Sequence, residues 1–328
     1  MSPKVKGKLS IWTVDDGRIG LANQTRGLAE AVAVMVPADV HNFTAHRKLF
    51  TLGRARKPLP GMEAPWPDIC IGCGRASVPY VRSLRNWSEG RTLTVQIQDP
   101  RIKPKHFDLV IPPEHDELDG ENVFPILGSP NRITSAQLES AAQEFSKKMK
   151  TFPRPHLAVV LGGHSKHHKF TNKNAKRLIK SLQGLLGNQV SLLITTSRRT
   201  PKSVIRALHR QFDKQGQAWL WTGARQDGPN PYFAFLQEAD AVLVTNDSTN
   251  MLVDAASVGR PILLFNLEGR DDKFDRLYDA LAGKGLARPF TGSLATWPVE
   301  PLNETDRAAK ETIRRLYKRM QDVRADKD

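Results

Sequence analysis

Strand-like and helix-like patterns alternate along this chain almost from end to end. Short apolar runs bounded by turn residues recur between longer stretches whose apolar residues are three and four positions apart. This alternation is typical of βα units, in which helices connect neighbouring strands of a mostly parallel sheet. We therefore predict an α/β fold of the doubly wound, Rossmann-like kind. The predicted strands are Leu9–Val14, Val40–Thr44, Asp68–Gly72, Leu93–Ile97 and Asp108–Ile111, then His156–Leu161, Val190–Thr195, Ala218–Trp221, Ala241–Thr245 and Pro261–Phe265.

The alternation is interrupted once, near the middle of the chain. A capping-box pattern at Thr134 and Gln137 opens a helix, and this helix ends before Pro153 and Pro155. With 328 residues, the chain has room for two domains of ordinary size. We predict two Rossmann-like domains, over 1–152 and 153–302, and a C-terminal amphipathic helix over 303–328.

The charge of the chain narrows the kinds of partner it can have. Lys and Arg number 49 against 34 Asp and Glu, which gives +15 at pH 7 and indicates a polyanionic partner. No zinc-finger, basic-zipper or aromatic RNA-binding pattern accompanies this charge, so a phosphorylated ligand or an anionic membrane surface is favoured over nucleic acid. We find no apolar run of membrane-spanning length and no signal-peptide pattern. We therefore expect a cytoplasmic protein, peripherally associated with the inner membrane.

The two cysteines, Cys70 and Cys73, could form a redox pair or half of a zinc site. No second pair of cysteines exists, and these two lie at the end of a strand pattern. We predict that they are buried, reduced thiols.

Two loops in the second half of the chain follow predicted strands and carry groups suited to an anion. In the first loop, Gly162 and Gly163 let the backbone approach a ligand, and Ser165 and Lys166 add donors. Since the histidines at 164, 167 and 168 have no acidic or cysteine neighbour in sequence, we expect no metal there. The second loop brings hydroxyls and arginines to the start of a helix at Pro201, an arrangement that suits a phosphate. Its candidate residues are Thr196, Ser197 and Arg198, beside Arg199.

A third loop, after the predicted strand Ala241–Thr245, is the most informative. It consists of good N-cap residues and leads into a helix that ends at Gly259. Free N–H groups at this helix start can hold a diphosphate, and Asp254, further along the helix, can accept a ribose hydroxyl. The candidate donor contacts in this segment are Asn246, Asp247, Ser248, Asn250, Met251 and Asp254. Each of the three loops could also be an ordinary capped connection.

Seven segments, in order, resemble one known family. They are "WTVDDGRIGLANQTRGLAEAV", "DICIGCGR", "VQIQDPR", "FDLVIPPEHDEL", "GGHSKHHKF", "TTSRRTP" and "TNDSTNMLVDAASVGRPI". The series looks like the family of the plant "elongated mitochondria" fission factor and its bacterial homologues, over residues 10 to 285. The resemblance implies two domains similar to GT-B glycosyltransferases that face a cleft. It also implies sugar transfer for the bacterial members, whereas the plant member is an adaptor at the mitochondrial surface.

The region 245–270 also resembles the donor-nucleotide helix of the peptidoglycan N-acetylglucosaminyltransferase. Asp254 occupies the acidic position that binds ribose there, and the resemblance nominates Glu268 and Arg270 as contacts of the donor sugar. The chain departs from this pattern at Asp247, where a small residue is usual.

In such a two-domain transferase, the acceptor binds to the first domain, 1–152, and the nucleotide sugar binds to the second, 153–302. The loop after the first strand then faces the acceptor. A carboxylate in that loop can deprotonate an acceptor hydroxyl, so Asp16 is the first candidate for the base and Asp15 the second. Glu114 and His115, with Asp116, are held in reserve. The alternative is a turn carboxylate paired with Arg18.

The sequence therefore predicts a metal-independent glycosyltransferase without a cofactor. Its donor substrate is a nucleotide-diphosphate sugar, and its acceptor is a lipid-linked or cell-envelope glycan such as lipopolysaccharide. The alternative is a non-catalytic adaptor of the same fold that recruits a protein partner to a membrane.

Overall fold

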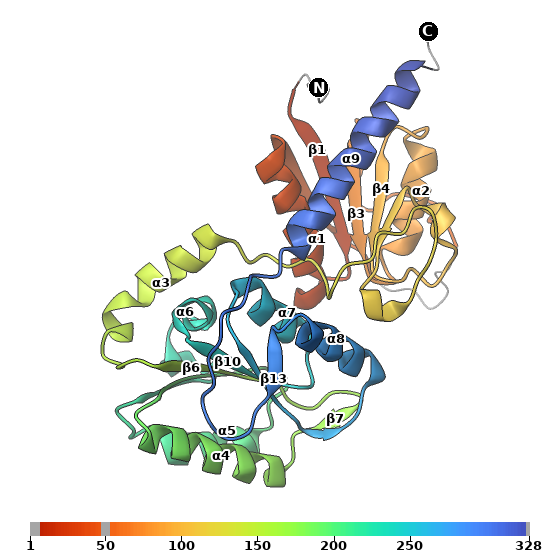
Figure 1. Ribbon diagram of the computed structural model, residues 1–328. Coiled ribbons are helices and arrows are strands. Elements are labelled where there is room, and N and C mark those ends of the chain that lie inside the picture. The colour runs from red at the N-terminus through yellow and green to blue at the C-terminus, as the bar shows by residue number, and fades with distance from the viewer. Residues whose placement is uncertain (1–6, 47–52, 326–328) are drawn as a thin grey trace. The chain divides into compact units, whose positions relative to one another are not determined.

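The computed structural model describes residues 7–46 and 53–325, and the side chains as far as residue 322. The chain forms two compact units, one made of 1–132 with 303–328 and the other of 133–302 (Figure 1). The first change of unit therefore lies at residue 132, not at the expected 152, and the C-terminal helix belongs to the first unit. In the part of the chain that the structure describes, no helix is long and apolar enough to cross a membrane.

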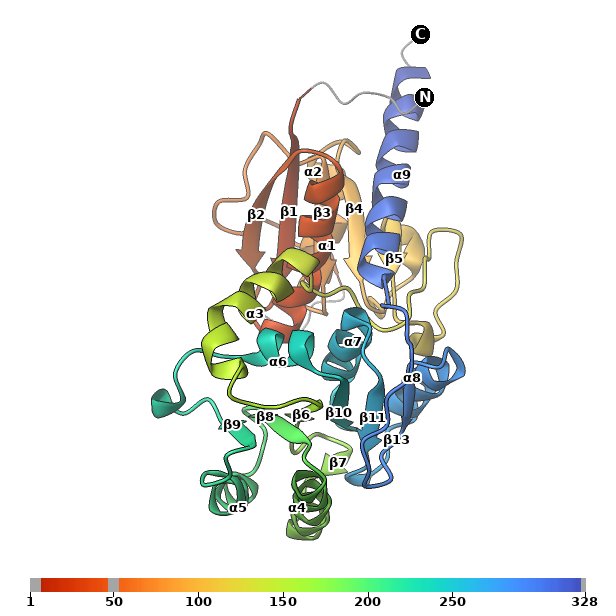
Figure 2. The ribbon, with the colours of Figure 1, turned by 60° about the vertical axis from the view of Figure 1, so that its left-hand side comes forward.

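The first unit contains a five-stranded parallel sheet with the order β2-β1-β3-β4-β5 (Figure 2). Helices α1 and α9 cover one face, where Leu28, Ala309 and Leu316 are buried, and α2 covers the other. Both faces are covered, as expected of a parallel sheet, and the strands β3, β4 and β5 are buried throughout, whereas the edge strand β2 carries exposed polar residues. The elements are β1 (Leu9–Asp15), α1 (Ile19–Met35), β2 (Ala38–Thr44), β3 (Ile69–Cys73), α2 (Val78–Trp87), β4 (Leu93–Ile97), β5 (Leu109–Ile111) and α9 (Glu304–Ala325), with 3₁₀ turns η1 (Pro104–His106) and η2 (Glu114–Asp116).

The second unit contains a six-stranded parallel sheet with the order β13-β11-β10-β6-β8-β9 (Figure 2). Its core joins the sheet to α4 and α5 through Leu178, Leu182, Leu208 and Phe212. The elements are α3 (Ser135–Met149), β6 (His156–Leu161), α4 (Asn172–Gly187), β8 (Ser191–Thr196), α5 (Lys202–Phe212), β9 (Ala218–Trp221), α6 (Tyr232–Glu238), β10 (Ala241–Thr245), α7 (Thr249–Val258), β11 (Ile262–Phe265), α8 (Asp272–Gly283) and β13 (Ala287–Pro289). A separate two-stranded ribbon pairs β7 (His168–Lys169) with β12 (Glu268–Gly269), and η3 (Arg225–Asp227) is a 3₁₀ turn.

Helix α3 belongs to the second unit because of what its side chains contact. The Phe145 ring lies edge-on to Trp219 at 5.7 Å, the ammonium of Lys148 lies 3.9 Å from the centre of the same indole, and Phe152, just past the helix, stacks on it at 5.9 Å. The proline break after α3 interrupts a pattern along the chain, but the side-chain contacts decide the unit to which the helix belongs.

The predicted fold class, two doubly wound α/β sheets, is confirmed, and ten strands lie within about two residues of their predicted bounds. The sequence analysis did not identify α6, α8, β13 or the β7–β12 ribbon. These are short or lie late in the chain, where their local patterns are weak.

Candidate functional site

The second sheet changes winding direction between β6 and β10. From β6 the chain continues outward through β8 to β9, and from β10 it continues the other way through β11 to β13 (Figure 2). In open parallel sheets of this kind, ligands bind in the crevice at the carboxyl ends of the two central strands. The loops at this position are the glycine-rich loop after β6 and the loop between β10 and α7.

The buried side chain of Asp247 connects these loops through hydrogen bonds and an ion pair. Its side chain is fully buried, and its carboxylate accepts hydrogen bonds from the Gly163 N–H (2.8 Å) and from the Thr245 hydroxyl (2.7 Å). It also forms an ion pair with Arg199, Nη2 to Oδ2 2.8 Å. Asp247, predicted to contact the donor, thus has its oxygens engaged within the protein, and the structure gives it a positioning role.

Arg199 also links the loop after β8 to this arrangement. Its backbone carbonyl accepts from the His164 N–H (3.2 Å), and its guanidinium donates to the His164 carbonyl (3.3 Å). The sequence pattern placed Arg199 among the loop arginines suited to a phosphate, and only the fold shows that it meets a buried carboxylate.

The two glycines after β6 are required by this packing. A Cβ atom on Gly162 would lie 2.0 Å from Asp247 Oδ1, and one on Gly163 would lie 1.9 Å from the Arg199 carbonyl oxygen. Both distances are far below contact distance, so glycine is needed there for packing between loops. The predicted close approach exists, but the neighbour in the structure is protein.

A pocket of about 280 Å³ opens where these loops meet the start of α7. Ser248 is the N-cap of α7, yet its side chain makes no capping hydrogen bond. The first N–H groups of a helix have no partner within the helix, so an uncapped start attracts an anion. The pocket is lined by Ser165, Lys166, His167, His168, Asp247, Ser248, Thr249, Asn250, Asp271 and Phe274.

His168 contributes an unsatisfied polar atom to this pocket. The residue is 2% exposed, and its buried Nε2 has no hydrogen-bond partner. Ser165 Oγ already accepts from the N–H groups of His167 and His168, so its hydroxyl proton can be donated to His168 Nδ1 at 3.4 Å. The proton of the neutral ring then lies on Nε2, which can donate to a ligand.

The charge state of His168 follows from its surroundings. Burial lowers its pKa below the ordinary 6.5, and the nearby Asp247, Asp271 and Asp275 oppose this only in part. A buried donor without a partner is rare in folded proteins and suggests a ligand.

The other predicted donor residues are distributed more widely. Ser165, Lys166, Ser248 and Asn250 line the pocket, and their contacts with a donor stay predictions. Asn246 is buried and accepts from the Leu267 N–H (2.8 Å), which is a structural contact. The following residues do not line the pocket: Thr196, Ser197, Arg198, Met251, Asp254, Glu268 and Arg270.

Several of these residues have other partners in the structure. Thr196 is buried, Ser197 accepts from the Arg199 N–H (3.2 Å), and Arg198 is exposed. Glu268 accepts from the Thr171 hydroxyl (2.8 Å). Arg270 pairs with two aspartates of α8, Asp272 at 3.2 Å and Asp275 at 2.9 Å. Their predicted contacts with a donor sugar stay predictions.

Asp254 lies in the second turn of α7, away from the pocket lining. The Tyr232 hydroxyl donates to its Oδ2 at 3.0 Å. Burial raises the pKa of Asp254 to about 7, and the hydrogen bond from Tyr232 acts in the opposite direction. Its protonation state therefore changes near neutral pH, which is unusual for an aspartate.

The candidate bases of the first unit lie at the carboxyl end of β1. Asp15 is buried and accepts from the Gly17 N–H (2.8 Å) and the Thr25 hydroxyl (3.3 Å), so it shapes the turn. Asp16 accepts from Arg18, with Nε 2.8 Å and Nη2 2.7 Å from Oδ2. Burial acts to raise the pKa of Asp16, but the hydrogen bonds and charge of Arg18 outweigh it, and the pKa lies below 3.8. These contacts are those of a turn carboxylate paired with Arg18.

The reserve candidates, Glu114 and His115, lie in η2 after β5. Their strand is three positions from β1 in the sheet, which corresponds to about 14 Å at the usual strand spacing. Asp16 and Glu114 therefore belong to loops that follow strands at separate positions of the sheet.

The cysteines are buried and free, as predicted. They lie on opposite faces of β3, and the Cys73 thiol donates to Gln24 Oε1 at 3.2 Å. Burial, reinforced by the charges of Asp15 and Asp16, raises the pKa of Cys73 well above its ordinary range, so it is a poor nucleophile. Within residues 7–46 and 53–325, no three His, Cys, Asp or Glu side chains group as metal ligands.

Solved structures of nucleotide-sugar enzymes share this fold. The UDP-GlcNAc 2-epimerase of Neisseria meningitidis, solved with UDP-GlcNAc bound, is 12% identical, with a TM-score of 0.54 over 94% of this chain and 100% of that one. The corresponding enzyme of Methanocaldococcus jannaschii is 8% identical, with a TM-score of 0.54 over 93% of this chain and 92% of that one. At such identities the likeness shows the fold alone, which is of the GT-B type.

Relatives in sequence come from a plant and a bacterium. The mitochondrial fission protein ELM1 of Arabidopsis thaliana is 29% identical over 283 residues, which are 78% of this chain and 66% of the plant protein, just under two thirds of its length. The uncharacterized protein RP120 of Rickettsia prowazekii is 26% identical over 92% of this chain and 97% of its own. The sequence profile of mitochondrial fission ELM1 matches residues 19–316. This match confirms the resemblance seen in the motifs, and the chain belongs to the mitochondrial fission ELM1 family.

Proposed function

We propose that this chain is a glycosyltransferase that binds a nucleotide-diphosphate sugar at the switch point of its second unit. The observation that carries the proposal is the pocket at the start of α7, where an uncapped helix meets Lys166 and the unpartnered Nε2 of buried His168. The GT-B fold supports it, because solved neighbours with this fold are UDP-GlcNAc 2-epimerases, one of them with UDP-GlcNAc bound.

The size and charge of the pocket suit the diphosphate. About 280 Å³ is less than the 300–1,000 Å³ that commonly holds a whole drug-sized ligand, but it accommodates a compact anionic group. When the bond to the sugar breaks, negative charge develops on the leaving diphosphate. The α7 N–H groups, His168 Nε2–H and Lys166 then stabilise it without a metal ion. Asp254 remains the residue that we propose accepts a hydrogen bond from a ribose hydroxyl of the donor.

On the acceptor side, Asp16 remains the first candidate for the base, with Asp15, Glu114 and His115 as alternatives. The proposed acceptor is a lipid-linked or cell-envelope glycan at the cytoplasmic face of the inner membrane. The net charge of +15 supports electrostatic association with anionic lipid.

Calorimetric titration of UDP into the full chain tests the donor site. We expect His168→Gln to bind UDP about 10- to 100-fold more weakly, because this is the loss in affinity that follows from removing one hydrogen bond to a charged group. His209→Gln is the matched control, because His209 lies on α5, pairs with Asp213 and is outside the pocket.

Equal affinity in wild type and His168→Gln would reject the pocket as the diphosphate site. The complete absence of nucleotide and nucleotide-sugar binding would favour the alternative, a membrane adaptor of the same fold. Sugar transfer itself is tested by release of UDP from UDP-sugars in the presence of envelope glycolipids.

A further inference from the structure

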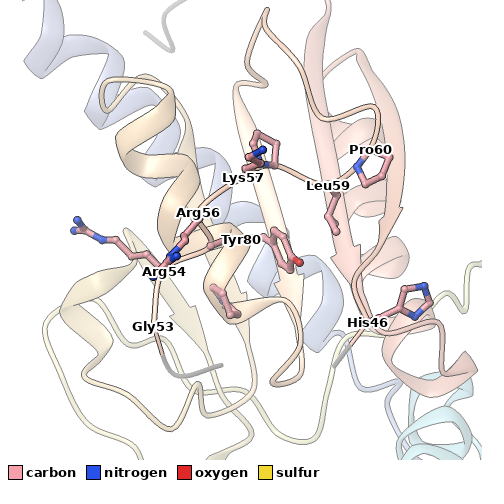
Figure 3. Close-up of a pocket in the computed structure, with 11 residues that line it drawn as sticks. His46, Gly53, Arg54, Arg56, Lys57, Leu59, Pro60 and Tyr80 are labelled. Atoms are coloured by element: carbon pink, nitrogen blue, oxygen red, sulfur yellow. The ribbon is translucent and has the colours of Figure 1, made fainter. Parts of the chain in front are cut away.

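A second pocket, in the first unit, has a different character. It encloses about 690 Å³ at the carboxyl end of β2 and beside the first turn of α2, and it is lined by His46, by residues 53–60 and by Pro79 and Tyr80 (Figure 3). Four of the eleven lining residues are basic or histidine, namely His46, Arg54, Arg56 and Lys57, and none is acidic. Its volume is that of a site for a whole small molecule.

The basic segment is held in place by its backbone. The Ala55 N–H donates to the Pro79 carbonyl (3.2 Å), and the Ala55 carbonyl accepts from the Ser83 hydroxyl (3.0 Å). Ser83 is buried on α2. The segment that carries Arg54 and Arg56 is therefore fixed against a helix, and the two charges stand on either side of the anchored residue.

These cations have no acidic partner among the described residues, whereas several other arginines of the unit do. Arg18 pairs with Asp16, Arg91 with Glu89 and Arg101 with Asp99. Within the described ranges, the side chains of Arg54, Arg56 and Lys57 make no ion pair. Three like charges within five residues repel one another, so binding of an anion relieves a cost already present in the free protein.

The positive electrostatic potential of the pocket extends beyond the residues that line it. Burial lowers the pKa of His106, and the charges of Arg82, Lys105, Arg54 and Lys103 lower it further. At least four cations thus act on one imidazole near the pocket. Its other lining is apolar or aromatic: Tyr80 lies between the arginines and His46 in Figure 3, with Leu59 nearby. An aromatic ring beside cations suits a ligand with an anionic group on a larger, less polar body.

We propose that this pocket binds the phosphomonoester of a phosphorylated acceptor, carried either by a soluble sugar or by a lipid headgroup. The inference rests on the proposed function, since it names the acceptor of that reaction. The location agrees with this: Thr44 pairs in register with Asp15 and contacts Gly17, and His46 is only two residues further, within about 7 Å along the chain. An acceptor held here lies at the same sheet edge as Asp16.

The test uses the full chain and two probes, glucose 6-phosphate and phosphatidylcholine vesicles that contain phosphatidic acid. Unphosphorylated glucose and pure phosphatidylcholine are the blanks. The variant R54E/R56E reverses two pocket charges. The control K180E/K214E makes the same change in net charge on exposed positions of the second unit. We expect at least one probe to bind wild type and control alike and to bind R54E/R56E at least about tenfold more weakly.

The probe that binds identifies the source of the phosphate. The proposal is overturned if neither probe binds, if the blanks bind equally, or if both double variants lose binding to the same degree, since a net-charge effect would then suffice. Binding of duplex DNA that depends on Arg54 and Arg56, without binding of either probe, would also overturn it. R54Q/R56Q repeats the test without charge reversal, and the Ala55 amide signal in NMR reports whether the segment keeps its place.

UDP titration separates this inference from the proposed function. If UDP binds and the phosphomonoesters do not, the acceptor pocket is wrong while the donor site stands. If the phosphomonoesters bind in the way described and neither UDP nor any other nucleotide or nucleotide sugar does, the pocket is a phosphate site, and the transferase proposal fails.

Discussion

The ion pair with Arg18 lowers the basicity of Asp16, the carboxylate that we propose first as the catalytic base. Arg18→Gln removes the interactions that lower the pKa of Asp16, so we expect this pKa to rise, as measured by NMR titration of the side-chain carboxyl. The lowered folded-state pKa means that the pair stabilises the fold above pH 3.8 and that this contribution is lost as the pH falls through the folded-state pKa. Because Arg18 is largely exposed, the loss at neutral pH is at most about 1 kcal/mol. An unchanged Asp16 pKa in the variant would contradict the assignment.

Asp254 is predicted to make nucleotide binding depend on pH. Its raised pKa of about 7 means that it is protonated in mildly acidic solution and accepts ribose hydroxyls best when ionised. We expect wild-type affinity for UDP to increase between about pH 6 and about pH 8, and Asp254→Asn to lose this trend. Tyr232→Phe removes a hydrogen bond that lowers the pKa and should move the midpoint upward. If Asp254→Asn keeps the wild-type increase of UDP affinity with pH, another titrating group causes that increase.

The same aspartate affects stability with the opposite sign from Asp16. Since its folded-state pKa lies above 3.8, the folded state binds more protons, and the free energy of unfolding falls as the pH rises from 3.8 through about 7. A tenfold difference in proton affinity between the folded and unfolded states corresponds to about 1.4 kcal/mol. In urea unfolding, Asp254→Asn should therefore show a smaller loss of stability over this range than wild type.

At the scale of elements, a substitution at Gly163 tests how tightly the loop after β6 packs, and Gly184 on α4 serves as the control. Gly163→Ala places a Cβ 1.9 Å from the Arg199 carbonyl, so the loops after β6 and β8 must separate. We expect a loss of about 1–3 kcal/mol in urea unfolding, together with weaker UDP binding. Gly184→Ala on α4 meets no atom within 4 Å and should stabilise the protein by up to about 1 kcal/mol. Similar effects at both positions would show that the loop packing is not tight.

Helix α3 shows what local pattern predicts about an element and what it does not. The helix begins where predicted, and the Thr134 hydroxyl accepts from the Gln137 N–H at 3.2 Å. The return bond of the predicted capping box is not formed, because the buried Gln137 Oε1 has no hydrogen-bond partner within residues 7–46 and 53–325. The pattern could not indicate which sheet the helix covers, because its partner, Trp219, lies about seventy residues later in the chain. Likewise, Asp247 was expected to face a ligand, but it faces Gly163, 84 residues earlier.

The whole molecule is organised so that the first unit depends on the end of the chain. Ala308, Ala309 and Leu316 of α9 are buried in its core, and Glu304 accepts from the Leu127 N–H at 3.0 Å. Removal of 303–328 should cost this unit at least about 4 kcal/mol and leave the second unit folded. In hydrogen exchange, β1 and β3 should lose protection while β6 and β10 keep it. A chain that ends at residue 322 is the control, and equal protection of both sheets after the full truncation would contradict the division.

The sequence by itself determined what depends on neighbouring residues. The period of apolar residues predicted the strands, the N-cap and glycine signals predicted where α3, α5 and α7 begin or end, and the order of the elements placed the polar loops at the carboxyl edges of the sheets. Only the tertiary structure decided which distant groups meet: Asp247 with Arg199, α9 with the first unit, and Arg54 and Arg56 with Tyr80 around a pocket whose described lining has no carboxylate. The unpartnered Nε2 of His168 is likewise visible only after folding, because burial and the absence of a partner are properties of the surroundings. Backbone conformation responds to local chemistry, whereas the partners of a side chain are set by packing between segments that the sequence keeps far apart.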